Sequence, residues 1–457
     1  MTIHRMRSIG SGDSLRTALK NGGIPVWLSC IVMGLGNWIA GQYAVGSLFF
    51  AAEAGVLAFL LIPGGGFYYL SLLPSLGWQV QEEIFNEELG VYQYAAGHNS
   101  QLILLYGVAT VFLIAGFILL WRASVRSGYR ALCRKKSGAR PDTFFQGVRS
   151  LSDRNAHKLL MFLPFFSLVI FTILPIVYMM CMAFTNYSKE GNHLILFDWV
   201  GLQNFRALLN PRAAIGKQFA GVLSWTLIWA AVATFSNFFV GTLIALLIGI
   251  RWIRFKGVWR SILSMTIAVP QFVSLMVIRS MVQPEGIVNQ MLRNAGLISD
   301  RLPFLTNAMW ARTLVIIVNL WVGVPYTVLQ VTGILQNIPT EQYEAAKLDG
   351  ANVLQVFFKI TLPYMLFVLT PYLITQFTTN INNFNIIYLL TRGEPVGVGN
   401  TAGATDLLVT WLYKLSVDQQ KYNIGAVIGI FSFVVLAVVS LLTYRSSNAY
   451  RNEEGFR

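Results

Sequence analysis

Charged side chains are scarce in this sequence, since Asp, Glu, Lys and Arg make up 12% of its 457 residues. Soluble domains carry about 25% charged residues, so the composition excludes an ordinary soluble protein. The three cysteines, Cys30, Cys133 and Cys181, have no paired or metal-ligand spacing, and none indicates a disulfide framework. His98 and His193 stand alone in predicted loops, and we predict no metal site.

Other signatures are also missing. A phosphate-binding loop of the form G-x-x-x-x-G-K-[ST] is absent, so an ATP-driven function would depend on an ATPase from another chain. The polar, basic segment from Met1 to Lys20 lacks the small-residue cleavage site of a secretory signal. The net charge of +14 resembles that of a nucleic-acid-binding protein, but the basic residues lie mainly in short loops beside apolar segments. That distribution is typical of the cytoplasmic loops of membrane proteins, and we expect no nucleic-acid partner.

Apolar residues are abundant: 55% of the chain is hydrophobic, and the mean hydropathy is +0.57. A membrane-spanning helix needs ~20 largely apolar residues. The sequence therefore predicts an all-α polytopic membrane protein with about eight spans. These are roughly Ala44–Ile62, Leu102–Trp121, Leu159–Phe184, Val222–Ile250, Ile262–Val282, Thr313–Leu335, Tyr364–Leu390 and Ile424–Tyr444. Glycines interrupt the apolar segment Ile24–Ala40, for which we expect an interfacial or half-inserted helix, with a full span as the alternative.

The charges of the loops orient these spans. The loop after the second span is strongly basic, whereas the loop before it holds Glu82, Glu83, Glu87 and Glu88 and no Lys or Arg. Because basic loops stay in the cytoplasm, we expect both termini there. The predicted organisation is a cytoplasmic N-terminus with an interfacial helix (1–43), two spans (44–121), a basic cytoplasmic linker (122–157), a six-span unit (158–445) and a cytoplasmic tail (446–457).

A short polar segment between the sixth and seventh spans has the pattern of two helices with a joint. Thr340 is a candidate N-cap for the first helix, and Glu344 follows within it. Ala345 and Ala346 expose little side chain, which lets another protein approach closely. Asp349-Gly350 predicts a helix end and a turn, and a second helix is expected from near Ala351 to Pro363. This segment is expected in the cytoplasm and suits docking to a partner.

Polar side chains inside spans are costly unless they face protein or water, so they are candidates for a transport pathway. Three spans carry them at helical spacing. The candidates are Asn319 and Tyr326 in the sixth span, with Gly323 between them as a position of close approach, Gln376, Asn380 and Asn383 in the seventh, and Gln271 and Ser274 in the fifth. Amides and hydroxyls both donate and accept hydrogen bonds, which suits a neutral polyhydroxylated ligand. The alternative is that these amides bond helices to one another.

Two sets of motifs resemble a known family. Glu344-Ala345-Ala346, Gly350 and Ile360-x-Leu362-Pro363 are similar in type and spacing to the EAA loop of bacterial ABC importer permeases. The segments Ala311–Asn319, Asn382-Asn383-Phe384 and Thr405–Val409 resemble the MalF-type maltose/maltodextrin permeases, over about residues 158 to 445. The short segment available after the third span resembles the Gram-positive version, which lacks a large extracellular domain.

The resemblance implies a type I ABC permease core of six spans plus two N-terminal spans, in the bacterial plasma membrane. It implies an EAA coupling loop at 336–363, in which Glu344, Ala345, Ala346, Asp349 and Gly350 contact a cytoplasmic ATPase. It also implies a maltose site formed by Asn319, Gly323, Tyr326, Gln376, Asn380 and Asn383, with Gln271 or Ser274. Gln376 stands where the enterobacterial relative has a serine, and Thr379 where it has a phenylalanine, which leaves the preferred sugar length open.

The same resemblance implies the partners and the cofactor. They are a MalG-type second permease, two ABC ATPase subunits that bind ATP and Mg²⁺, and an extracellular sugar-binding lipoprotein that meets segments 186–212 and 392–420. No cofactor is expected on this chain itself. The expected cargo is maltose or maltodextrin, and another neutral oligosaccharide is the first alternative.

Two other classes of protein remain as alternatives. An ion-coupled secondary transporter usually buries carboxylates or histidines, and Glu53 is the clear acidic candidate inside a span. A membrane enzyme acting on lipid-linked sugars would need clustered carboxylates, for which the sequence offers Glu82–Glu88, read here as a solvated loop.

Overall fold

The computed structural model describes residues 14–76, 83–87, 89–94, 99–140, 143–153, 156–250 and 252–446. The chain forms two compact units, Met1–Gly201 and Leu202–Arg457. The third span, Leu159–Met182, lies within the first of these compact units. The predicted six-span unit, which would begin near residue 158, therefore stays a prediction. Glu82, Glu88, His98 and nearly all of the predicted tail lie outside the described residues.

The predicted class of fold, a polytopic helical membrane protein, is confirmed. Among the described residues, seven segments are long and apolar enough to cross a membrane. They are Tyr43–Leu61, Ser100–Lys136, Leu159–Met182, Ala214–Gly249, Ala308–Gln336, Val353–Leu390 and Tyr422–Leu442. The predicted fifth span is a pair of helices, α12 (Lys256–Ala268) and α13 (Gln271–Met281), bent by 86° at a break that contains Pro270, and it makes an eighth span if the pair crosses together.

The first unit is built around α6, a helix of 37 residues. Its elements are α1 (Leu15–Asn21), α2 (Gly23–Ile31), α3 (Leu35–Ala40), α4 (Tyr43–Leu61), α5 (Gly66–Leu72), β1 (Glu83–Asn86), β2 (Val91–Tyr94), α6 (Ser100–Lys136), α7 (Phe144–Ser152), α8 (Ala156–Leu168), the π-helical turn η2 (Val169–Ile173), α9 (Leu174–Met182) and the 3₁₀ turn η3 (Glu190–Asn192). The loop expected before α6 contains a two-stranded antiparallel hairpin, with Phe85 opposite Tyr92.

The segment Ile24–Ala40 is broken into two short helices, α2 and α3. Gly34 adopts a left-handed conformation at the break, with φ of 85°. The freed backbone N–H groups are satisfied by side chains: Met33 donates to Glu53 Oε2 at 2.7 Å and Gly34 to Ser124 Oγ at 3.0 Å. α3 packs closely on α6, since a Cβ at Gly36 would lie 3.2 Å from Gly128 Cα. Each helix is too short to span a membrane alone.

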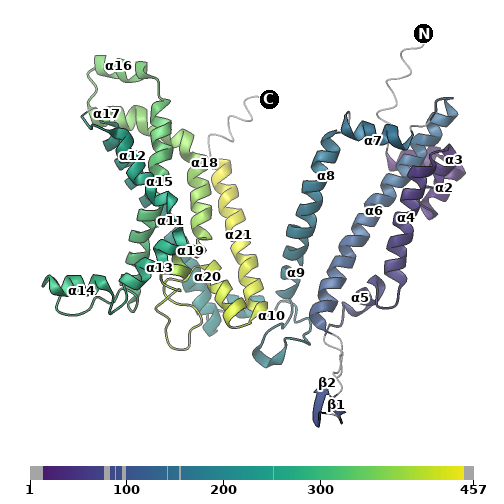
Figure 1. Cartoon of the computed structure of the whole chain (residues 1–457), viewed down its shortest axis with the longest axis horizontal. Coiled ribbons are helices and arrows are strands. Elements are labelled where there is room, and N and C mark those ends of the chain that lie inside the picture. Colours follow the sequence, from purple (N-terminus) through teal and green to yellow (C-terminus); the bar gives the residue numbers. More distant parts are fainter. Residues whose placement is uncertain are drawn as a thin grey trace. The chain divides into compact units, whose positions relative to one another are not determined.

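The second unit contains the long helices that form the remaining spans (Figure 1). Its elements are α10 (Gln203–Leu209), α11 (Ala214–Gly249), α12, α13, α14 (Ile287–Asn294), α15 (Ala308–Gln336), α16 (Thr340–Leu348), α17 (Val353–Val356), the π-helical turn η4 (Phe357–Thr361), α18 (Leu362–Ile381), α19 (Phe384–Leu390), α20 (Leu408–Tyr413), the π-helical turn η5 (Lys414–Asp418) and α21 (Tyr422–Ser446). α16 lies at one end of this unit, and α14 and α20 lie towards the other (Figure 1).

The core of the second unit lies between α11 and α15, which make the most extensive contact of any two elements. Small residues allow this approach, because a Cβ at Gly241 would collide with Thr327 and one at Gly323 would collide with Asn237. One apolar cluster includes Trp229 from α11 and Ile387 from α19, and a second joins α11, α15 and α18. The two clusters hold α18 and α19 against the same pair of helices.

Candidate functional site

The predicted seventh span breaks in its polar half. α18 ends at Ile381 and α19 begins at Phe384. Asn383 stabilises the start of α19, since its side-chain oxygen accepts a hydrogen bond from the backbone N–H of Ile386 at 3.3 Å. The sequence predicted Gln376, Asn380 and Asn383 on one continuous helical face. That prediction is wrong for Asn383, which is the N-cap of α19, because a helix end needs a side-chain acceptor for its free N–H groups.

A cavity of about 340 Å³ lies beside this break. Its lining comes from α11, α13, α15, α18 and α19: Asn237, Gln271, Asn319, Val322, Gly323, Tyr326, Gln376, Thr379, Asn380, Asn382, Asn383, Phe384, Asn385 and Ile386. The structure thus brings together seven of the predicted substrate residues, and Ser274 is not among the lining. No charged side chain occurs among these described lining residues.

Asn237 and Asn319 leave hydrogen-bonding atoms unused beside the cavity. Asn319 is buried on α15 and Asn237 is buried on α11. Within the described part of the chain, the Asn319 Nδ2 donor and the Asn237 Oδ1 acceptor have no hydrogen-bond partner. A buried unsatisfied polar group costs about 1–3 kcal/mol, so such a pair indicates a place for a polar ligand or water. Asn237 was not selected from the sequence. This residue could have been identified as an isolated amide inside a strongly apolar span.

Other predicted residues have packing contacts of their own. Asn380 is buried, its Nδ2 donates to Thr234 Oγ1 at 3.0 Å, and its carbonyl accepts from the Trp229 indole at 3.1 Å. Gly323 provides the space that the Asn237 side chain occupies. Asn380 therefore bonds α18 to α11, as the helix-bonding alternative expected, and Gly323 allows α15 to approach α11 closely.

Two aromatic residues, Tyr326 on α15 and Phe384 on α19, line the cavity. Phe384 stacks on Tyr388 with ring centroids 4.8 Å apart, and Tyr413 packs edge-on against both. Tyr326 is 47% exposed, and so presents ring surface to the cavity that it lines. Aromatic faces of this kind bury the C–H surface of a sugar ring, while amides bind its hydroxyls.

The predicted pair of short helices with a joint is present as α16, Gly350 and α17. Thr340 is the first helical residue and Pro339 is the N-cap, with no side-chain capping bond, so the predicted Thr340 cap is wrong. Gly350 forms the joint, with φ of 73°. α17 begins at Val353, two residues later than expected, because Asn352 and Gln355 form a capping box. From there the chain continues through η4 into α18 without leaving helical geometry.

The outer face of this element is exposed. Glu344 and Ala345 lie on the surface, whereas Ala346 is buried, which corrects the expectation that both alanines face a partner. Leu348 and Val353 are 90% and 84% exposed. Tyr343 Oη lies 3.2 Å from Thr361 Oγ1 and so links α16 to the start of α18.

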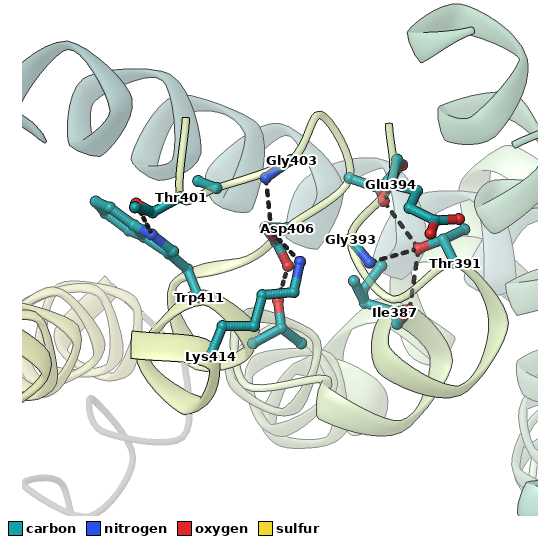
Figure 2. Close-up of polar contacts among 12 residues, drawn as sticks. Ile387, Thr391, Gly393, Glu394, Thr401, Gly403, Asp406, Trp411 and Lys414 are labelled. Carbon is teal, nitrogen blue, oxygen red and sulfur yellow. Dashed lines mark hydrogen bonds and ion pairs between the residues drawn. The ribbon is translucent and has the colours of Figure 1, made fainter. Parts of the chain in front are cut away.

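The loop after α19 is held by a buried ionic cluster (Figure 2). Asp406 is fully buried and accepts from Lys414 at 2.7 Å, from Gly403 N–H at 2.7 Å and from the Thr410 hydroxyl at 2.9 Å. Burial raises the pKa of Asp406, and these donors oppose that shift. Gly393 must be a glycine here, because a Cβ would collide with Asp406.

Comparison with known proteins identifies the family. Residues 237–451 match the model described as "Binding-protein-dependent transport system inner membrane component". The maltodextrin transport system permease protein MdxF of Bacillus subtilis (strain 168) is 33% identical over 442 residues, which cover 93% of this chain and 96% of the relative. The chain belongs to the binding-protein-dependent ABC importer permeases.

Other permeases of this family are similar to the chain as well. The galactooligosaccharides permease GanP of Bacillus subtilis (strain 168) is 33% identical, over 78% of this chain and 85% of its own length. A crystal structure of a bacterial ABC transporter involved in the import of the acidic polysaccharide alginate superposes with a TM-score of 0.52 at 25% identity. It covers 66% of this chain and 97% of that one. The match to MdxF extends into the spans before residue 158, further than the resemblance expected from the sequence.

Proposed function

We propose that this permease carries maltose or maltodextrins into the cell through the cavity beside the α18–α19 break. The observation that carries the proposal is the uncharged, amide-rich lining, in which Asn237 and Asn319 offer an unused acceptor and donor. A neutral sugar supplies hydroxyls that satisfy both. The similarity to MdxF supports an α-glucan as the cargo, and the similarity to GanP makes another neutral oligosaccharide the second candidate.

An Asn319→Ala variant tests the sugar site. Loss of one hydrogen bond to the sugar removes about 0.5–1.5 kcal/mol, which is about a two- to tenfold rise in the KM for maltotriose uptake by proteoliposomes. Asn337→Ala is the matched control, since this exposed amide at the C-cap of the same helix does not line the cavity. Equal KM values for the wild type and Asn319→Ala would remove this residue from the site.

We further propose that α16 and α17 dock on a cytoplasmic ATPase, and that both termini face the same side. The complete importer would contain two such ATPases, which bind ATP and Mg²⁺. It would also contain a MalG-type second permease and an extracellular sugar-binding lipoprotein. The exposed Glu344, Leu348 and Val353 support the docking, because exposed apolar side chains next to a charge are typical of interaction sites. The basic loop after α6 supports the orientation.

A Glu344→Lys variant tests the docking. Reversal of this charge should abolish ATP-driven uptake while the protein still reaches the membrane, and the ATPase should no longer co-purify with it. Glu285→Lys, on the loop at the other end of the second unit, is the control and should keep the ATPase. Retention of the ATPase and full uptake by Glu344→Lys would contradict the proposed interface.

A further inference from the structure

A second cavity, of about 230 Å³, lies in the second unit between the start of α15 and the loop before α20, an element that lies towards the end away from α16 (Figure 1). Its polar lining comes from Gln218 and Trp225 on α11, Arg312 on α15, and Asn400 and Asp406 on the loop after α19. This cavity shares no lining residue with the one beside the α18–α19 break. It is therefore a separate site, and its chemistry is different.

Arg312 is the charged group that this cavity exposes. Its guanidinium carbon lies 4.2 Å from the centre of the Trp225 ring, and its Nε donates to the Ala404 carbonyl at 2.9 Å. These two contacts fix the plane of the guanidinium. Among the described residues, no acceptor bonds its two terminal nitrogens, and the side chain is half-buried. Four N–H donors thus remain available at the cavity.

The carboxylates beside this cavity are already paired. Asp406 is bound by Lys414, Gly403 and Thr410, as described above. Glu394 pairs with Arg279 at 3.5 Å, and Arg279 also donates to the Leu390 carbonyl. These two ion pairs leave the guanidinium of Arg312 as the charge in the described lining of the cavity that no carboxylate balances; Arg392, on the same loop, is exposed and does not line the cavity. A single negative charge entering the cavity would balance the charge of Arg312.

Hydrogen bonds hold another part of the lining in place, around Gln218. Gln218 Oε1 accepts from the backbone N–H of Thr401 at 2.8 Å, from that of Ala402 at 3.1 Å and from the Thr401 hydroxyl at 2.9 Å. The Trp411 indole donates to the same hydroxyl (Figure 2). A preformed loop loses little entropy when it binds a partner, so the site is suited to recognition.

A carboxylate is the group that fits these donors. A fixed guanidinium with free terminal nitrogens binds a carboxylate through two parallel hydrogen bonds. Stacking of a sugar on Trp225 is disfavoured, because the guanidinium already covers the ring and the residue is nearly buried. In the proposed orientation, this end of the second unit faces the outside of the cell.

We infer that the Arg312 cavity receives an aspartate or glutamate side chain of the extracellular sugar-binding protein. This inference rests on the proposed function, because it takes its partner and its sidedness from there. It adds the position and the charge of the contact. The exposed Asn400 at the rim is placed to bond the neighbouring backbone of that partner.

Zero-length cross-linking tests the contact directly. In an Arg312→Lys variant, carbodiimide should join the introduced amine to an acidic residue of the sugar-loaded binding protein of the same system, added to the complete importer. Wild type and Arg293→Lys are the controls, because Arg293 is exposed on α14 outside the cavity. A cross-linked peptide found in Arg312→Lys alone supports the inference. The inference is overturned if the introduced lysine is cross-linked only to Asp406 of the same chain. It is also overturned if no cross-link forms while the binding protein remains bound to the importer.

Affinity gives a second test. Arg312→Gln keeps a donor for the Ala404 carbonyl but loses the charge, and should raise about tenfold the binding-protein concentration that half-saturates uptake. It should also weaken the salt dependence of that concentration, because screening acts on charge pairs. An unchanged value in Arg312→Gln overturns this inference and leaves the sugar cavity standing. Failure of the binding protein to bind the wild-type importer would overturn the proposed function itself.

Discussion

At the scale of single residues, a buried ion pair at Asp406 and Lys414 determines the shape of the loop after α19. Lys414 Nζ lies 2.7 Å from Asp406 Oδ2, and the side chains of Asp406 and Lys414 are 0% and 12% exposed. Removal of one partner from such a pair leaves an uncompensated charge away from water. The same carboxylate also holds Gly403 and Thr410, so this loop and the start of α20 depend on one side chain.

An Asp406→Ala substitution is therefore expected to destabilise the second unit by about 3–5 kcal/mol. The measurement is the melting temperature of the detergent-purified protein. The double variant Asp406→Asn, Lys414→Met should recover most of the loss, because no buried charge then stands alone. Asp418→Ala, whose carboxylate is exposed, is the control. A melting temperature of Asp406→Ala equal to that of the control would show that the pair contributes nothing.

At the scale of elements, Gly350 separates α16 from the helix that continues into the cavity. Its φ of 73° is a left-handed conformation, and a Cβ there would meet no atom within 4 Å. Glycine is therefore favoured at this position by the left-handed backbone conformation and not by a lack of space for a side chain. Side chains that avoid the left-handed region should shift the angle between α16 and α17, whereas asparagine, which tolerates that region, should not.

This difference gives a prediction with an internal control. Gly350→Val should cost about 1–2 kcal/mol locally and reduce ATP-driven sugar uptake several-fold, while Gly350→Asn should stay close to the wild type. Uptake by proteoliposomes that contain the complete importer is the measurement. Equal impairment by both substitutions would point to a lost contact at this position in place of backbone strain.

The limits of sequence-based prediction also appear at this scale. The spans were predictable because a long apolar segment is a local property, and Gly323 was recognised as a position of close approach. Its partner Asn237 was not, since periodicity gives the face of a helix and not the neighbour that packs on it. The α18–α19 break was missed for the same reason: Ile386 and Ile387 are held by residues of other helices.

At the scale of the whole molecule, the arrangement bears on how transport is driven. Glu53, the carboxylate that a proton relay would use, is buried in the first unit, where it accepts the backbone N–H of Met33. Its side chain stabilises the break between α2 and α3, which explains a carboxylate inside a span. The described lining of the cavity beside the α18–α19 break holds no Asp, Glu or His.

Sugar uptake is accordingly expected to depend on ATP and not on a proton gradient. A protonophore should leave uptake by proteoliposomes with enclosed ATP unchanged, and omission of the ATPase should abolish it. Glu53→Gln, which retains an acceptor for Met33, should keep wild-type uptake, whereas Glu53→Leu should lower the yield of folded protein. Loss of uptake in the presence of the protonophore would support an ion-coupled carrier.

The break at Asn382 and Asn383 also bears on how members of this family diverge. Gln376 and Thr379 precede it on α18 and border the cavity, while Ile386, Ile387 and Leu390 follow it inside an apolar core. Mutations at Gln376 and Thr379 can therefore alter cargo preference without touching that core, whereas Asn380 on the same helix is bonded to Trp229 within it. New sugar specificities can accumulate at these two positions while selection for folding preserves the core.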